Sequence, residues 1–429
     1  METRNWFRSQ ITDMLLGEHR LALKSEAFEL SPHFEGIDNL GLYLHVPFCR
    51  QICPYCPYNK ELFSVALAER YTEAVLKEID RYSAMVGSLP VTTFYIGGGT
   101  PTTMLHTGLP RILESVYRRF NMQCGIHLES HPNDLSPENL STIVALGVEH
   151  LSIGIEALQD HHLRILCRPY TADEAQAVIA RAVGKGFECV NVDLIFALPD
   201  QTHEELESSG HALIELGVDQ IAAYPLFNFP YTQWPQLARQ NHYRSYGLLQ
   251  KRRMLQVLEQ VFYAADYTRT SVWAFTKTGS PKYCSVTVPL YLGLGASAGS
   301  YLRDIFYLNT FNTEAYIQAL ADGRMPIALS LELSERMQMA GWLYWHIYET
   351  RFSKDDFERR FQLRLDAVYG RYLRLLSFLG LLTEGEDEVA LTDAGAYWLH
   401  TVQDLFSIDY ISKLWGTSRQ APWPAEVRL

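Results

Sequence analysis

Three of the seven cysteines lie within one stretch of eight residues, at Cys49, Cys53 and Cys56. Thiolates at this spacing can hold one side of an iron–sulfur cube and leave the fourth iron open to another ligand. A zinc knuckle and a loop of three buried cysteines are the alternatives. A structural zinc site usually has four protein ligands. No fourth cysteine is close, so the spacing favours the cluster.

A run of three glycines, Gly97, Gly98 and Gly99, ends an apolar segment and is followed by Thr100. Glycine lets a backbone approach a ligand closely and leaves N–H and C=O groups open for binding. A tight turn from strand to helix would also explain the run. It ends a predicted strand on the same rim as the cysteines, which favours a binding site.

Three carboxylates end or interrupt apolar, strand-like runs: Glu129, Glu156 and Asp193. Arg168 lies in the loop region after the second of them. A carboxylate within an apolar strand is costly unless it has a partner. A structural ion pair would explain any one of them. Three on successive strands, aimed at the same rim, indicate a polar ligand with hydroxyls and an ammonium group.

Strand-like and helix-like segments alternate through the first half of the chain. The six strand-like runs are Leu40–Val46, Val91–Ile96, Gly125–Glu129, His150–Ile155, Cys189–Ile195 and Gln220–Tyr224. The amphipathic segments between them are Ala66–Met85, Leu109–Phe120, Pro137–Leu146, Ala172–Gly184 and His203–Leu216. This alternation predicts βα units around a parallel sheet, either most of a (β/α) barrel or an open doubly wound sheet. In both folds ligands bind at the carboxyl ends of the strands.

The second half of the chain reads differently. A long helix is predicted over Tyr243–Tyr263, then turn-rich sequence to about Leu308, then further helices from Thr313 and a hairpin around Leu382–Leu391. Helices followed by a small hairpin suggest a winged-helix-like unit. We therefore expect four parts: an N-terminal helical extension (1–39), the barrel (40–240), a mixed segment completing the active-site mouth (241–312) and a C-terminal helical domain (313–429).

Composition narrows the class of protein. The chain has 429 residues and a formal net charge of −12, which disfavours a general nucleic-acid binder because phosphate neutralisation needs an excess of cations. No stretch approaches the ~18 apolar residues of a membrane span. The N-terminus lacks the pattern of a secretion signal, and the odd cysteine count does not suggest a disulfide framework. We expect a cytoplasmic protein.

Taken together, the blocks resemble a known family. The cysteine motif after Tyr43, the Gly97–Pro101 run and the segment from Asp193 to Thr202 are similar to the radical S-adenosylmethionine (SAM) superfamily. Within it, the chain resembles the oxygen-independent coproporphyrinogen III oxidase-like branch, including its C-methyltransferase relatives, from about Gly41 to Leu308. The resemblance implies an α/β fold: a partial (β/α)6 barrel with a mostly helical, winged-helix-like C-terminal domain.

The resemblance also implies the cofactors. A [4Fe-4S] cluster would bind Cys49, Cys53 and Cys56, and SAM would chelate the open iron through its amino and carboxylate groups. One electron from a flavodoxin- or ferredoxin-type donor would cleave SAM to methionine and a 5′-deoxyadenosyl radical, so that the cofactor carries the difficult chemistry.

Particular residues match family positions that contact one or two SAM molecules. Tyr55 matches an aromatic near the adenine, and Gly98, Gly99 and Thr100 match the methionine-binding loop. The other matching positions are Tyr43, Glu129, Glu156, Arg168, Asp193, Phe227 and Gly299. These are cofactor-binding positions, and the sequence assigns no catalytic residue.

Three departures from the family pattern bear on the reaction. Tyr58 stands where the oxidase usually has another cysteine, and Glu156 stands where the branch usually has glutamine. The His-Asn-x-x-Tyr-Trp block of the haem-chaperone relatives is missing before Tyr291–Gly295.

We expect a small-molecule substrate or ligand and consider three functions. The motifs favour C-methylation, or related carbon–carbon bond formation, on an aromatic or conjugated compound. The first alternative is oxidase-like decarboxylation, or radical attack, on a tetrapyrrole. The second is a haem-binding chaperone, against which the missing block argues.

Overall fold

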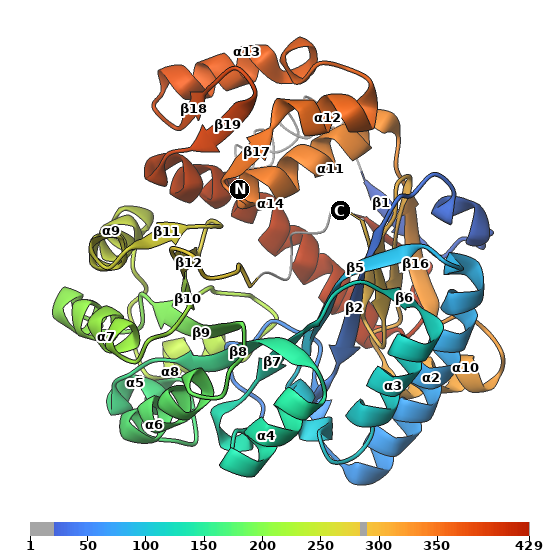
Figure 1. The fold of residues 1–429 in the computed structure, drawn as a ribbon, viewed down its shortest axis with the longest axis horizontal. Coiled ribbons are helices and arrows are strands. Elements are labelled where there is room, and N and C mark those ends of the chain that lie inside the picture. The colour runs from blue at the N-terminus through green and yellow to red at the C-terminus, as the bar shows by residue number, and fades with distance from the viewer. Residues whose placement is uncertain (1–20, 284–289, 429) are drawn as a thin grey trace.

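The six predicted strands lie side by side and parallel at the centre of the molecule (Figure 1). The structure is a computed structural model that describes residues 21–283 and 290–428. The strands are neighbours in chain order: β2 (Leu40–Val46), β5 (Pro90–Gly98), β7 (Ile126–Ser130), β8 (Val148–Glu156), β9 (Cys189–Phe196) and β10 (Gln220–Pro225). All five pairings between them are parallel. The six predicted strands are confirmed.

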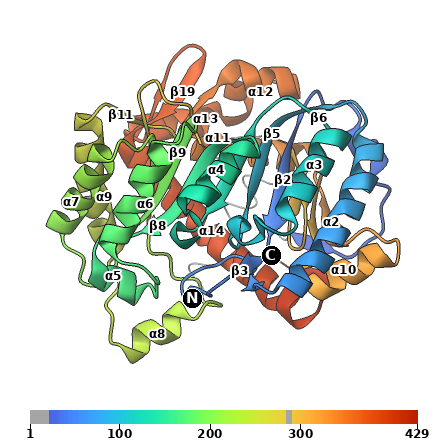
Figure 2. The same cartoon turned by 60° about the horizontal axis from the view of Figure 1, so that its bottom comes forward.

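Helices on the outer side of the curved sheet connect these strands (Figure 2). They are α2 (Val65–Val86), α3 (Leu109–Arg119), α4 (Pro137–Ala145), α5 (Asp160–Ile165), α6 (Ala172–Val183) and α7 (His203–Glu215). All except the short α5 were predicted from the sequence. Strand alternating with helix around a parallel sheet is the arrangement that the hydrophobic pattern indicated.

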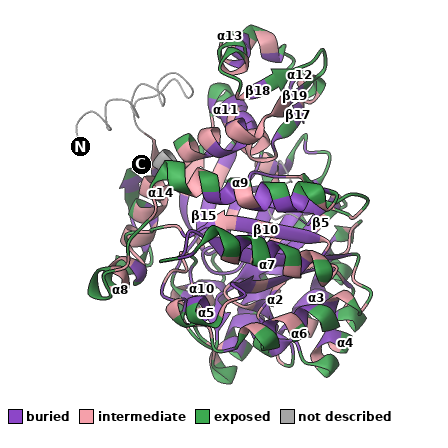
Figure 3. Ribbon diagram, turned by 90° about the vertical axis from the view of Figure 1, so that its left-hand side faces the viewer, coloured by how far each residue is buried: buried purple, intermediate pink, exposed green. Residues whose placement is uncertain are grey.

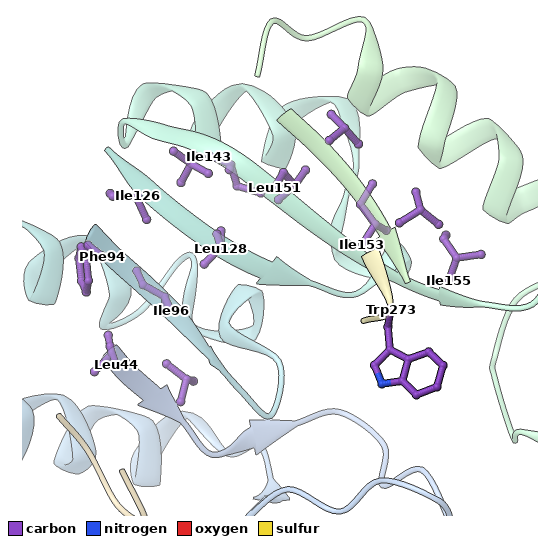
Figure 4. Packing of buried hydrophobic residues seen from close by; sticks show 14 of the residues in the cluster. Leu44, Phe94, Ile96, Ile126, Leu128, Ile143, Leu151, Ile153, Ile155 and Trp273 are labelled. Carbon is purple, nitrogen blue, oxygen red and sulfur yellow. The ribbon is translucent and has the colours of Figure 1, made fainter. Parts of the chain in front are cut away.

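The alternation of side chains along each strand separates the core from the barrel interior. Phe94 and Ile96 of β5 and Leu128 of β7 point toward the helices and are buried (Figure 4). Their neighbours Tyr95 and Glu129 therefore point to the opposite face, because successive side chains of a strand alternate. The same alternation places a polar lining inside the barrel.

The sheet continues beyond these six strands, first through a further parallel pairing of β2 with residues 291–294, and does not close within the described residues. Its order runs from β11 (Tyr267–Arg269) and β12 (Ala274–Lys277), through the six parallel strands, to a second set. That set is β13 (Tyr291–Leu294), β14 (Gly299–Tyr301), β15 (Ile305–Asn309), β16 (Ile327–Glu332), β1 (Ala22–Lys24) and β20 (Glu426–Arg428). The short strand β6 (Asn121–Met122) pairs with β5. The barrel is thus partial, as expected, with an extension that the sequence did not predict.

The C-terminal unit has the predicted winged-helix-like elements. Its helices are α11 (Glu335–Tyr348), α12 (Lys354–Phe361) and α13 (Leu365–Phe378), and its sheet is β17 (Arg351–Ser353), β19 (Glu388–Leu391) and β18 (Leu382–Glu384). Trp342, Phe357 and Leu373 belong to its own buried cluster. Figure 3 shows this unit apart from the barrel helices, with buried positions along its inner side.

Two helices join the C-terminal part to the barrel. Helix α10 (Thr313–Ala321) packs on α2, and α14 (Asp393–Gln420) runs from the C-terminal unit to β20. The main sheet therefore includes strands from both ends of the described chain. The domain boundaries at 240 and 312 stay predictions.

Two predicted helical segments differ in the structure. Residues 1–20 of the predicted N-terminal extension lie outside the described residues. The rest forms β1 and one 3-10 turn (Ser31–Phe34), because β1 pairs with both β16 and β20. The long helix predicted over Tyr243–Tyr263 begins later, as α9 (Leu248–Ala264), because Gly247 is extended and caps it. A shorter helix, α8 (Trp234–Gln240), precedes it.

Among the described residues, no helix combines the length and the apolar character needed to span a membrane.

Candidate active site

The three clustered cysteines lie in a loop between β2 and α2 whose ends are held together. Strand β3 (Phe48–Cys49) pairs with β4 (Glu61–Leu62), and the Phe63 N–H donates to the Cys49 carbonyl at 2.9 Å. From the other side, the Trp234 N–H donates to the Pro54 carbonyl at 2.9 Å. The loop is therefore fixed at both ends and in its middle.

The spacing of the three sulfurs fits a cluster better than a single ion. They do not all lie within 4.8 Å of one another, whereas two other groups of described side chains have their ligand atoms that close. One tetrahedral zinc with bonds of about 2.3 Å would hold its sulfurs roughly 3.8 Å apart. An iron–sulfur cube binds each thiolate at a separate corner. The donor set thus fits a [4Fe-4S] cluster.

Two of the three clustered cysteines, Cys49 and Cys53, each accept a hydrogen bond at the sulfur. The Thr100 hydroxyl donates to the Cys49 sulfur at 3.5 Å, and the Arg168 guanidinium donates to the Cys53 sulfur at 3.4 Å. Burial raises the pKa of the Cys49 thiol to about 12 and also raises the pKa of Cys56. Both thiols are thus protonated until a metal displaces the proton, after which donors of this kind orient and tune the ligands.

The glycine run at the end of β5 packs directly against the cysteine loop. The Gly99 N–H donates to the Val46 carbonyl and the Thr100 N–H donates to the Phe48 carbonyl, both at 2.7 Å. A β-carbon on Gly99 would lie 2.8 Å from the Phe48 carbonyl oxygen, and Gly98 has a φ of 113°. The glycines are therefore needed for a tight turn, and that turn places Thr100 at the Cys49 sulfur.

Glu129, on the neighbouring strand β7, lies next to this glycine turn and accepts two hydrogen bonds. The Tyr95 hydroxyl donates to one carboxylate oxygen and the Gly98 N–H donates to the other at 2.9 Å. The Tyr43 ring stacks on Tyr95 with 6.0 Å between centroids, and its hydroxyl lies 2.8 Å from Nδ1 of His45. Burial raises the pKa of Glu129 above its ordinary value. Three predicted residues, Tyr43, Gly98 and Glu129, are thus brought together.

Arg168 and Glu156 lie near each other without forming an ion pair within 4.0 Å. The Arg168 guanidinium donates to the Gly154 carbonyl, to the Tyr170 hydroxyl at 2.7 Å and to the Cys53 sulfur. Glu156, whose φ is 70°, accepts a hydrogen bond from the Tyr224 hydroxyl at 3.0 Å. Such a backbone conformation is strained for a residue other than glycine. The two side chains therefore do not simply neutralise each other.

Tyr55 completes this side of the site. Its hydroxyl is buried close to the Glu156 carboxylate but makes no hydrogen bond of good geometry. Burial, followed by the Glu156 carboxylate, raises the pKa of that hydroxyl. A buried hydroxyl without a partner is costly, so a polar group of a ligand would stabilise it.

Asp193 faces the same interior from β9. It accepts hydrogen bonds from the Asn191 side chain at 2.9 Å and from the Ser152 hydroxyl at 3.4 Å. Burial raises the pKa of Asp193, and the nearby Glu156 and Glu129 carboxylates raise it further. Three carboxylates that repel one another in a buried site favour the binding of a positively charged ligand.

Phe227 and Gly299 are placed differently. Phe227 follows β10 and contacts Trp273 edge-on at 6.3 Å between ring centroids. Gly299 lies in β14, where an added β-carbon would be 3.2 Å from Leu308. No described contact joins Gly299 to the other candidate residues, so its proposed role in binding SAM has the least support.

Several residues of the site were not singled out from the sequence. Tyr95 and Tyr224 hold the carboxylates, and the alternation along their strands could have placed them inside the barrel. Tyr283 also fills the interior: its backbone exchanges two hydrogen bonds with the Gln220 side chain, at 2.8 and 3.0 Å. Its ring lies 5.5 Å from that of Tyr95. It comes from a loop, where no periodic signal exists.

The departures from the family pattern are also visible. Tyr58 is 55% exposed as a residue, but its hydroxyl end is enclosed, and this burial raises the pKa of the hydroxyl; the Glu129 carboxylate raises it further. Tyr58 therefore lies at the mouth of the site. Most of the segment before Tyr291, where the chaperone block would stand, lies outside the described residues.

Comparison with known proteins gives a consistent result. Residues 43–213 match the family model described as the radical SAM superfamily. The heme chaperone HemW of Bacillus subtilis is 27% identical over 82% of this chain and 95% of its own length. The oxygen-independent coproporphyrinogen III oxidase of Paracoccus denitrificans is 24% identical over 66% of this chain and 67% of its own length.

A solved structure shows the same fold. Coproporphyrinogen III oxidase (HemN) from Escherichia coli, described as a radical SAM enzyme, superimposes with a TM-score of 0.77. The match covers 90% of this chain and 94% of that one, at 21% identity.

Proposed function

This chain is a radical SAM protein with its radical SAM domain at residues 43–213, and we propose that it uses the radical it generates on a tetrapyrrole. The cofactors of this superfamily are a [4Fe-4S] cluster and SAM. When bound, they supply a 5′-deoxyadenosyl radical and methionine after one-electron reduction. The observation that carries the cofactor assignment is the meeting of three thiols and three largely enclosed carboxylates at one end of the parallel strands, and the named relatives support the tetrapyrrole.

We assign the residues of the site three tasks: holding the cluster, orienting its thiolate ligands and binding SAM. Cys49, Cys53 and Cys56 would hold the cluster, and the donors on Thr100 and Arg168 orient two of their sulfurs. A [4Fe-4S] cluster held by only three cysteine thiolates would keep one iron open for SAM.

The carboxylates would bind SAM rather than move protons. Glu129 and Asp193 each have an oxygen that accepts from neutral donors of the chain. The remaining acceptor capacity suits ribose hydroxyls and an ammonium group. The buried Tyr55 hydroxyl is available to the adenine side. Together these groups position the ligand and keep water away from the reacting end.

The comparisons do not support C-methylation, which the sequence motifs favoured. The relatives act on or bind tetrapyrroles according to their names: heme for HemW, and coproporphyrinogen III for the oxidase. A tetrapyrrole substrate is consistent with the conjugated compound expected from the sequence. We propose oxidase-like or ring-directed radical chemistry, with a flavodoxin- or ferredoxin-type electron donor and no nucleic-acid partner.

A haem chaperone is the second candidate. The relative from Bacillus subtilis aligns over 95% of its length, and that alignment favours haem binding. The missing His-Asn-x-x-Tyr-Trp block argues against it.

An anaerobic assay separates the candidates. Reconstituted protein is incubated with dithionite, SAM and either coproporphyrinogen III or haem, and products are identified by mass. We expect 5′-deoxyadenosine together with a modified tetrapyrrole. Stoichiometric haem binding with no modified product would favour the chaperone. If methyl-labelled SAM yields labelled product together with S-adenosylhomocysteine, the C-methylation hypothesis is favoured again.

A further inference from the structure

Two imidazoles and a carboxylate meet on the outer helices, outside the candidate active site. Nε2 of His161 lies 3.1 Å from one oxygen of Glu205, and Nε2 of His162 lies 3.3 Å from the other. All three ligand atoms lie within 4.8 Å of one another. The two histidines belong to α5 and the glutamate belongs to α7.

This donor set suits a borderline divalent cation. Two histidines and a glutamate, with a fourth position left to water, form a common zinc site. Bonds of about 2.0–2.1 Å in a tetrahedral site place neighbouring ligand atoms roughly 3.3 Å apart. The observed nitrogen–oxygen distances are close to that separation. His161 is 51% exposed, so water can reach the open position.

The ligands are held in place before any ion binds. The Glu205 carboxylate accepts a hydrogen bond from the Thr202 N–H at 2.9 Å, which is part of the cap of α7. The Gln159 side chain, just before α5, donates to the Ser209 hydroxyl of α7 at 2.9 Å. His162 is fully buried. Fixed ligands lose little freedom on binding, which raises the affinity for an ion.

A second group of this kind is weaker. It consists of Glu149, His150 and Glu188. It has one imidazole, and its His150–Glu188 distance is 3.7 Å with Glu188 60% exposed. Two imidazoles distinguish the first group, because nitrogen ligands select zinc-like cations over the abundant oxygen-seeking ones.

We propose that His161, His162 and Glu205 bind a zinc-class divalent cation that joins α5 to α7. The site would act on the cluster region through the chain itself. Helix α5 leads into Arg168, whose N–H donates to the Leu163 carbonyl at 2.8 Å. The cation would thereby hold the loop that carries Arg168 against the cysteines. This role is one of positioning, since none of the three ligands contacts the candidate active site.

Zinc titration of the cluster-loaded protein tests the site. The cluster is first reconstituted anaerobically, so that Cys49, Cys53 and Cys56 are occupied, and zinc binding is then measured by calorimetry. We expect one equivalent of zinc to bind. His161→Ala, at a half-exposed position, should lower the affinity at least tenfold without lowering the zinc-free melting temperature.

A matched control is available on α7, the helix that carries Glu205. His211 is 57% exposed and lies 3.9 Å from Glu207, with no third ligand. His211→Ala should bind zinc as the native protein does, and zinc should raise the melting temperature of both but not of His161→Ala. Equal zinc affinity of His161→Ala and the native protein would overturn the proposal. So would the absence of zinc binding by the native protein. Neither result bears on SAM cleavage, so the radical SAM assignment is tested separately.

Discussion

The guanidinium of Arg168 donates a hydrogen bond to the sulfur of Cys53 across 3.4 Å. The same group donates to the Gly154 carbonyl at the end of β8. One side chain thus ties the end of a barrel strand to a predicted cluster ligand. We therefore expect Arg168 to act on the SAM that is cleaved at the cluster, because it contacts a predicted cluster thiol.

Arg168→Lys should therefore impair SAM cleavage itself. The lysine ammonium is a single point charge and cannot reach three acceptors as the planar guanidinium does. Loss of one hydrogen bond to a charged group costs about 1.5–3 kcal/mol, which corresponds to a decrease of roughly tenfold or more in the rate of 5′-deoxyadenosine formation. Iron content should stay near that of the native protein. Unchanged cleavage would show that the contact with Cys53 is incidental.

Each of the three clustered cysteines should be essential for iron binding. Cys49→Ala, Cys53→Ala and Cys56→Ala should each lose the cluster and abolish SAM cleavage, because two thiolates are too few protein ligands. Iron analysis and the visible absorption of the anaerobic protein measure the loss. Cys124→Ala, at a half-buried cysteine away from the loop, is the matched control and should keep its iron. Full iron content and full SAM cleavage in any one of the three variants would contradict the assignment of these cysteines as cluster ligands.

Asp193→Asn should weaken SAM binding by roughly 1–3 kcal/mol, the scale of a hydrogen bond to a charged group. The same change should not destabilise the SAM-free protein, since it relieves repulsion from Glu156 and Glu129. Equilibrium binding of SAM and thermal unfolding measure the two effects. If SAM affinity is retained and only the pH dependence of turnover changes, Asp193 transfers a proton instead.

The buried Glu78 carboxyl should make the free energy of unfolding depend on pH. It is buried on α2 and accepts hydrogen bonds from the Gly295 N–H and the Asn309 side chain, each at 2.7 Å, and from the Tyr316 hydroxyl. Burial nevertheless raises the pKa of Glu78 from 4.5 to about 7. The folded protein then binds this proton more tightly than the unfolded chain does. The stabilisation is complete below pH ~4.5 and is lost as the pH rises through about 7, by about 3 kcal/mol in total.

Comparison with Glu78→Gln isolates this effect. The variant cannot titrate, so the native protein should lose stability relative to it between pH 5 and 8 in urea unfolding. Glu73→Gln is the control, since Glu73 lies on the same helix, is 59% exposed and pairs with Arg111. A difference between native protein and Glu78→Gln that does not vary with pH would mean that the three donors keep the carboxylate ionised throughout.

The sequence predicted the helices and strands in which apolar residues recur at a regular interval. The six parallel strands and most of their helices agree with the structure to within a few residues, because apolar positions recur every second or about every fourth residue. The thiols, the glycine turn and Glu129, Glu156 and Asp193 were found because polar groups at the ends of apolar strands are unusual.

Other features carry no local signal. Tyr283 reaches the barrel interior from a loop, and only the tertiary fold places it beside Tyr95. The partners β1 and β20 lie at opposite ends of the described chain, so no window of sequence relates them. The helix expected over Tyr243–Tyr263 was too long because Gly247 interrupts it. Of the cysteines outside the cluster motif, Cys189 is buried, Cys124 is half-buried, Cys167 is exposed and Cys284 lies outside the described residues.

The pairing of β1 with β20 has a consequence for synthesis on the ribosome. The six parallel strands pair with neighbours in sequence and can assemble as they emerge. Strand β1 emerges first but keeps one unpaired edge until Glu426–Arg428 leave the exit tunnel. An open strand edge invites pairing with other chains. The β1 edge of a nascent chain is therefore open to such pairing from its own synthesis until residues 426–428 have emerged.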